Sequence, residues 1–195
     1  MNTYMNARRF QRQAGYTIDQ TILIVAVIAI LVTMIIGSVG WDLLSRAGGT
    51  KLSSHLRQFE TANGQFYAKH SLWPHQCVAG TDSFGALISK DALDVALMPG
   101  FDPDTDFENL LPSYEFPAGG GTVEHNFGSG GDITMDVQTF SGQDYLVIRM
   151  TSVPKAEFEE ADEGIDGAMD PSSGRLQGTD NGSTYDLVYY ANVVN

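Results

Sequence analysis

The sequence contains one cysteine, Cys77, among its 195 residues. A single thiol excludes an intrachain disulfide, so packing or a bound metal ion must hold the C-terminal part of the chain in place. We expect Cys77 to be buried. His75 and Cys77 do not make a zinc site on their own, because zinc takes three or four protein ligands.

Basic residues are also scarce. The chain has 11 Lys and Arg against 24 Asp and Glu, which gives a formal net charge of −13. After Cys77 the imbalance is larger, because 21 acids face four bases, Lys90, Arg149, Lys155 and Arg175. Such a surface repels nucleic acid and anionic lipid, so we expect no nucleic-acid partner. An acidic surface that keeps an exported domain soluble is a sufficient explanation of this charge.

Sequence motifs of enzyme chemistry are missing. There is no Gly-x-Ser-x-Gly elbow, and neither glycine-rich run ends in the Gly-Lys-Ser/Thr of a phosphate-binding loop. One cysteine with four scattered histidines is no evidence of a catalytic pair. We therefore predict that the protein is not an enzyme.

Charge is absent altogether from Gln20 to Trp41. As a helix this run is about 33 Å long, enough to cross a bilayer core of about 30 Å. A secretory signal peptide has a shorter apolar region, and no clear Ala-x-Ala cleavage site follows this one. The chemistry changes instead on the N-terminal side, where Arg8, Arg9 and Arg12 give way to Gly15. Cleavage there leaves the apolar helix on the mature chain.

The order of a short basic leader, a glycine, an aromatic residue, Thr-Ile, an acid and a long apolar run resembles the type IV pilin and pseudopilin superfamily. The resemblance is specific over residues 8–41 and diffuse beyond them. It implies that a prepilin peptidase cuts between Gly15 and Tyr16 and methylates the new N-terminus. The side chains that remain sum to −16, from 8 bases and 24 acids.

The chain departs from this family at one position. The family usually carries Glu five residues after the cut, where this chain has Gln20, preceded by Asp19. A carboxylate is needed there because an N-terminal ammonium buried among apolar helices is costly unless it is paired. Either Asp19 supplies that carboxylate one residue early, or the subunit sits at a filament tip, where no neighbour needs neutralising.

The helical pattern continues after the apolar run. One apolar face recurs at intervals of three and four residues, comprising Leu43, Leu44, Ala47, Leu52, Leu56, Phe59 and Phe66. We expect Pro74 to end this helix.

Gly37 and Gly40 each weaken a helix by about 1 kcal/mol relative to alanine, so they are candidate sites of helix flexibility, although glycine is also common in membrane helices. We expect the pair Gly48-Gly49 to mark a kink.

The rest of the chain reads as a small head. A helical patch is expected over 84–98, and glycines at 118–121 and 128–131 read as flexible connectors. Alternation over 132–140 and a β-branched run over 145–153 predict a hairpin, and 185–194 a last strand. Between them Val153-Pro154 opens an acidic helix from Lys155 to about Ile165.

Acidic residues supply the only candidate metal ligands. Asp162, Asp166 and Asp170 recur every four residues, and calcium prefers six to eight oxygen ligands, so these three are candidates for fastening the C-terminal loop. Exposed acids on a polar helix and loop are the simpler interpretation. Asp102, Asp104 and Asp106 alternate but lack the Gly and closing Glu of an EF-hand. Apart from this calcium candidate, we predict no cofactor.

The predicted fold class is α+β and type IV pilin-like, with a long N-terminal helix packed on a C-terminal antiparallel sheet. The predicted parts are a leader (1–15), a membrane-spanning and filament-core half-helix (16–41), an amphipathic half-helix (42–74) and a globular head (75–195). The predicted function is that of a structural subunit of a type IV pilus-like filament in adhesion, motility or uptake.

The resemblance also implies where the protein works and with what. Its partners are further copies of the chain in a helical filament, the prepilin peptidase and an assembly platform. It resides in the bacterial inner membrane as a precursor and outside the cell once assembled. The alternatives are a minor or tip pseudopilin of a type II secretion-like system, and a membrane-anchored binding domain that never polymerises.

Overall fold

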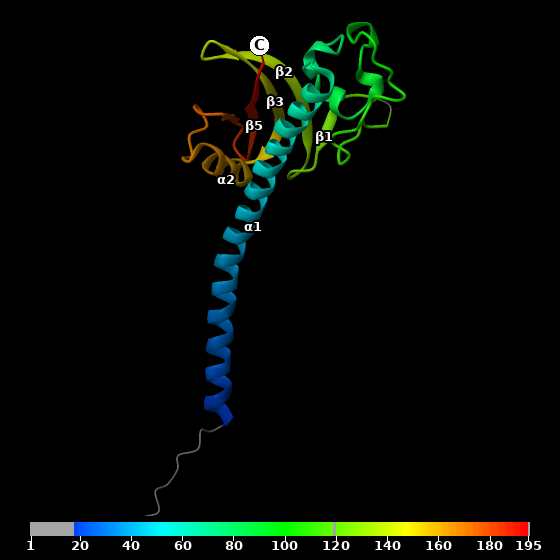
Figure 1. The fold of residues 1–195 in the computed structure, drawn as a ribbon. Helices are drawn as coiled ribbons and strands as arrows, with labels where there is room; N and C mark the ends of the chain where they lie inside the picture. The colour runs from blue at the N-terminus through cyan, green and yellow to red at the C-terminus, as the bar shows by residue number, and fades with distance from the viewer. Residues whose placement is uncertain (1–17, 119, 195) are drawn as a thin grey trace, which may run out of the picture. The chain divides into compact units, whose positions relative to one another are not determined.

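The computed structural model describes residues 18–118 and 120–194, without the side chains of residues 37–47. The predicted leader, including the cleavage positions Gly15 and Tyr16, lies outside the described residues. The chain divides into two compact units, residues 1–42 and 43–195. The fold is α+β, with an apolar N-terminal helical segment and a five-stranded antiparallel sheet (Figure 1).

Helix α1 has the bounds Ile18–His70. The sequence supports this length because no proline occurs before Pro74. The helix ends where Ser71 takes a left-handed φ of 55° and donates its N–H to the Tyr67 carbonyl over 2.7 Å. The predicted end at Pro74 is therefore too late. Pro74 instead begins a short 3₁₀ helix, η1 (Pro74–Gln76).

The sheet has the strand order β1-β2-β3-β5-β4, and every neighbouring pair is antiparallel. The strands are β1 (Val123–His125), β2 (Gly131–Phe140), β3 (Gln143–Pro154), β4 (Leu176–Asp180) and β5 (Thr184–Val194). The predicted hairpin is confirmed as β2 and β3, and the predicted last strand as β5. β1 and β4 were missed by the prediction, because both are short and lack a run of alternating apolar residues.

The predicted acidic helix is confirmed as α2 (Lys155–Asp166). It follows β3 directly and ends at Gly167, whose φ of 81° requires the left-handed region that glycine adopts readily. α2 turns its apolar side to the sheet: Phe158 is buried and stacks on Tyr185 of β5 with ring centroids 4.2 Å apart.

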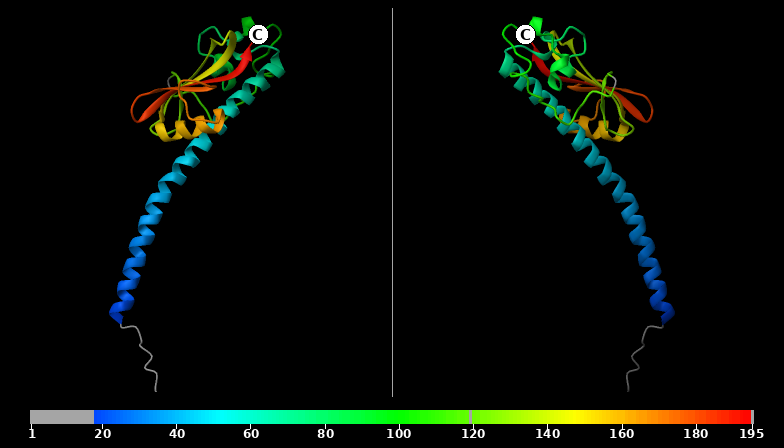
Figure 2. Two further views of the ribbon diagram at one scale, coloured as in Figure 1. Left: turned by 90° about the vertical axis from the view of Figure 1, so that its left-hand side faces the viewer. Right: turned by 90° about the vertical axis from the view of Figure 1, so that its right-hand side faces the viewer.

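The core of the head lies between one face of the sheet and α1 residues 52–66 (Figure 2). Its largest fully buried side chains come from both layers and from the connecting segments, and include Leu52, Leu56, Phe59, Phe84, Phe127, Ile133, Met135, Leu146, Ile148, Phe158 and Tyr189. Burial of such a side chain stabilises a fold by roughly 1.5–3 kcal/mol. The described part of the predicted amphipathic face, Leu52, Leu56, Phe59 and Phe66, is therefore the face that holds the head. The side chains of Leu43, Leu44 and Ala47 lie outside the described residues.

The helical patch predicted over 84–98 is wrong. This stretch forms three short 3₁₀ helices, η2 (Phe84–Leu87), η3 (Lys90–Ala92) and η4 (Val95–Leu97). The Ser89 and Asp94 side chains accept the N–H groups of Asp91 and Ala96, so η3 and η4 each have an N-cap of their own. Apolar residues three apart suit 3₁₀ turns as well as an α-helix, which is why spacing alone misled.

Candidate functional site

The first candidate site is the apolar segment Ile18–Ile36 of α1. Every side chain in it is exposed, and it is the one helix in the described part of the chain that is long and apolar enough to cross a membrane. Large aliphatic side chains cover all sides of it, with Ile22, Leu23 and Met34 each more than 60 % exposed. Contiguous apolar surface of this size marks a membrane or a protein contact.

The predicted assembly residues lie on this segment. Asp19 is in the first turn of α1, where a negative charge is favoured by the helix dipole, and both Asp19 and Gln20 are exposed. Gly37 and Gly40 are helical within α1. The predicted flexibility at these two glycines and the predicted pairing of Asp19 with a new N-terminus stay predictions.

α1 continues through Gly48 and Gly49, and the kink predicted at this pair stays a prediction. These glycines are a contact with α2. A Cβ on Gly49 would lie 2.3 Å from the Glu160 Cβ, and one on Gly48 would lie 2.7 Å from the Glu157 Cγ. Because glycine has no side chain, the backbone of α1 can contact the side chains of α2 at this place.

Farther along α1, polar side chains connect the helix to the head. His55 Nδ1 lies 2.7 Å from the Tyr114 hydroxyl, and burial lowers the pKa of His55. One turn later, Glu60 accepts hydrogen bonds from the Tyr189 hydroxyl over 2.9 Å and from Arg175 Nη2 over 3.0 Å. These contacts fix the helix face that carries Arg57 relative to the sheet.

The candidate calcium ligands Asp162 and Asp166 accept backbone hydrogen bonds in the structure. Asp162 Oδ2 accepts the Asp170 N–H over 2.8 Å, and the two oxygens of Asp166 accept the N–H groups of Arg175 and Leu176. The carboxylates thus tie the loop after α2 back to the helix. Among the described residues no group of three His, Cys, Asp or Glu side chains is placed to hold a metal ion, so calcium here stays an unsupported prediction.

Asp162 is an unusual acid because it is fully buried and its Oδ1 has no hydrogen-bond partner in the protein. Burial, with added repulsion from Asp166 and Asp170, raises its pKa to about 6. The folded state therefore holds a proton on Asp162 more tightly than the unfolded chain does. The stability that this proton provides is complete below pH 4 and is lost as the pH rises through about 6.

We accordingly expect Asp162→Asn to stabilise the head at neutral pH. Asparagine keeps an acceptor for the Asp170 N–H but carries no buried charge, so the gain grows from near zero at pH 4 to about 2 kcal/mol at pH 7.5. Thermal unfolding of both proteins at the two pH values measures it. Asp166→Asn is the control: it loses one of two backbone acceptors and should be less stable at pH 7.5. A gain that does not change with pH would contradict the assignment.

The other acidic and thiol candidates have structural roles. Asp102 Oδ1 accepts the Asp104 N–H and Asp106 Oδ2 accepts the Asp102 N–H, so this loop is a set of side-chain turns. Cys77 is buried, as predicted, and burial raises the pKa of its thiol to about 11. A thiol in this state is inert.

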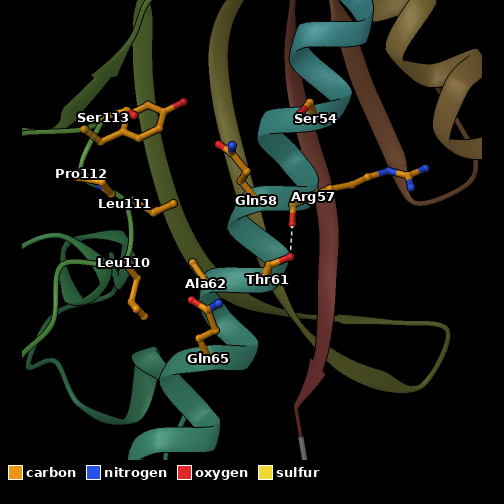
Figure 3. Close-up of a pocket in the computed structure, with 11 residues that line it drawn as sticks. Ser54, Arg57, Gln58, Thr61, Ala62, Gln65, Leu110, Leu111, Pro112 and Ser113 are labelled. Carbon is orange, nitrogen blue, oxygen red and sulfur yellow. Dashed lines mark hydrogen bonds between the residues drawn. The ribbon is translucent and has the colours of Figure 1, made fainter.

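A groove of about 480 Å³ runs between α1 and residues 110–114 (Figure 3). α1 contributes mostly polar side chains, including Gln58, Thr61 and Gln65, and the facing loop contributes Leu110 to Ser113. The Arg57 guanidinium points away from this loop on the other side of the helix (Figure 3). This part of α1 carries two basic residues, Lys51 and Arg57, in a chain that is otherwise acidic.

In comparisons with known proteins, no family model, no curated protein and no solved structure matches this chain.

Proposed function

We propose that the chain is a structural pilin subunit that polymerises into a type IV pilus-like surface filament. One observation carries the proposal: α1 is helical from an apolar segment exposed on every side to an amphipathic half buried against the head. A helix that only anchored the head would need nothing more than lipid contact. The basic leader sequence before it, which ends at Gly15, supports processing and assembly in addition.

The driving force for assembly is burial of Ile18–Ile36 between copies. Each aliphatic side chain moved out of water contributes roughly 1.5–3 kcal/mol, and the inner membrane supplies that environment before assembly. In this proposal Asp19, in the first turn of α1, pairs with the ammonium of a neighbour whose chain begins at Tyr16. The assembly platform moves the subunit from lipid into the fibre, and the head is then exposed outside the cell.

A minor or tip pseudopilin is the second candidate. Gln20 favours it, since a subunit with no neighbour above it has no ammonium to neutralise. Abundance decides between the two: a shaft subunit occurs along the whole fibre, and a tip subunit occurs at trace stoichiometry.

The test is intact-mass spectrometry of sheared surface filaments from cells with a prepilin peptidase. We expect a chain that starts at methylated Tyr16. Gly15→Asp should leave the 1–15 leader attached and reduce surface filaments to background, because the peptidase site is lost. Gly40→Ala, within α1 and away from the cut, should be processed normally. A surface protein that retains Met1, or filaments made equally well by Gly15→Asp, would refute the proposal.

A further inference from the structure

Every Lys and Arg side chain of the head after Cys77 forms an ion pair within the chain. The four ion pairs are Lys90 with Asp104, Arg149 with Asp136 at 3.2 Å, Lys155 with Asp180 at 2.6 Å, and Arg175 with Glu60 at 3.0 Å. On α1, Lys69 is likewise paired with Glu108 at 3.2 Å. The head therefore has no spare positive charge on its sheet or loops with which to bind another acidic surface.

The spare positive charge lies on the exposed face of α1. In the described part of the chain, Lys51 and Arg57 are the basic side chains that form no ion pair. The Lys51 Nζ lies 5.0 Å above the Phe127 ring, so Lys51 already makes a cation–π contact within the chain. Arg57 is exposed and its guanidinium donates no hydrogen bond to a described residue. Arg57 is therefore the cation of this helix face that is free to meet a carboxylate.

The most acidic element of the head is α2. This helix carries six acids, Glu157, Glu159, Glu160, Asp162, Glu163 and Asp166, and a single base, Lys155, which forms an ion pair with Asp180. None of the six forms an ion pair with a described residue. Asp162 and Asp166 accept loop N–H groups, and Glu157 and Glu160 pack on Gly48 and Gly49, which leaves Glu159 and Glu163 to meet a partner. Glu163 is exposed, and Glu159 is half-buried. Two such surfaces repel each other unless a cation lies between them.

We propose that α2 of a second copy of this chain docks on the exposed face of α1, with Arg57 as the cation that receives its carboxylates. The inference rests on the proposed self-assembly and names its contact surface. Charge complementarity selects the occupant, because the same chain supplies an unpaired guanidinium on one surface and unpaired carboxylates on the other. Arginine suits this role because its planar fork binds a carboxylate with two parallel hydrogen bonds.

The head's charge argues against other occupants of this face. Nucleic acid and anionic lipid carry negative charge, and 21 acids against four paired bases repel both over a Debye length of about 10 Å at 0.1 M salt. A carboxylate on a second copy meets the same repulsion, but copies held in one membrane or filament are already concentrated by Ile18–Ile36. The contact then aligns copies that apolar burial has brought together.

Zero-length cross-linking of the full chain tests the contact. Arg57→Lys keeps the positive charge and provides an amine that a carbodiimide joins to a carboxylate. Co-expressing this chain with a copy that keeps Arg57 and carries Glu159→Asp marks the α2 peptide of the second copy by its lower mass, so a link to the marked peptide joins two copies. We expect links from position 57 of one copy to the α2 acids of another. Gln65→Lys, an exposed position of the same helix in a chain with Arg57 intact, should give at least fivefold fewer.

Charge exchange provides the second readout. Arg57→Glu should lower filament yield about tenfold with normal removal of the leader, and adding Glu163→Lys should restore most of that yield. Filaments without links from position 57 to α2, or links no more frequent than in Gln65→Lys, overturn this contact and leave the pilin proposal intact. Links in membranes without any filament support the contact and refute the filament. Absence of both overturns both proposals.

Discussion

Gly49→Ala is expected to destabilise the head by about 2 kcal/mol although it exchanges one small residue for another. The new Cβ would lie 2.3 Å from the Glu160 Cβ and 3.2 Å from the Ala161 backbone nitrogen. Neither atom can move unless α2 moves, and α2 is held by its buried Phe158. Overpacking of this kind costs typically 1–3 kcal/mol, more than the gain of about 1 kcal/mol from replacing glycine by alanine in a helix.

Gly48→Ala is the matched control, one residue earlier in the same helix. Its Cβ would meet only the outer atoms of the Glu157 side chain, with the Cγ at 2.7 Å. That side chain can rotate, and Glu157 Oε2 has no partner to lose. We therefore expect Gly48→Ala to be neutral or slightly stabilising.

Alkylation of Cys77 measures both variants in the full chain. The thiol is buried, so it reacts only when the head unfolds. The temperature of half-labelling should fall by about 4–8 °C in Gly49→Ala and stay within about 2 °C of the parent in Gly48→Ala. Equal effects of the two substitutions would show that helix propensity, and not contact with α2, decides stability at this pair.

The sequence predicts the parts of this fold whose signals are local and strong. The uncharged run, the amphipathic face through Leu56 and Phe59, the hairpin and α2 all follow from periodicity, length and turn residues. They could be placed because each element carries its own apolar pattern. The fold class α+β follows from their order.

The parts that the sequence does not give depend on contacts between distant residues. Gly48-Gly49 has the pattern of a helix break, and only the position of α2 shows it to be a packing site. The aspartates at 162, 166 and 170 have the spacing of ligands, yet their oxygens accept backbone N–H groups of the following loop. Arg57 stands out only once the ion-pair partners of Lys69, Lys90, Arg149, Lys155 and Arg175 are known.

The glycine run at 128–131 shows the same limit. The sequence predicts a flexible connector, but Gly131 begins β2 and is packed on two sides. His125 is 3 % exposed opposite Gly131 in the β1–β2 pair, and its Nε2 lies 2.7 Å from the Thr151 carbonyl oxygen. The Phe127 N–H donates to its Nδ1, which places the ring proton on Nε2. Gly131 lies between that ring and that carbonyl.

Gly131→Ala should therefore destabilise the head more than Gly49→Ala does. Its Cβ would lie 2.2 Å from the Thr151 carbonyl oxygen and 2.9 Å from His125 Nε2, and neither can withdraw without breaking their hydrogen bond. A lost buried hydrogen bond costs about 1–3 kcal/mol, and the overpacking adds about 1–3 kcal/mol to it. We expect a loss of about 2–6 kcal/mol and separation of β1 from the sheet.

Two controls identify the cause of that loss. Gly80→Ala meets no atom within 4 Å, so it should leave the unfolding temperature unchanged. Gly142→Ala also meets no atom within 4 Å but has a φ of 82°, so it reports backbone strain alone, about 1 kcal/mol. Hydrogen exchange of the β1 and β2 amides should rise in Gly131→Ala only. If Gly131→Ala unfolds at the same temperature as Gly80→Ala, the close approach of β2 to Thr151 and His125 does not exist. Residues 128–131 are then the flexible connector that their composition indicates.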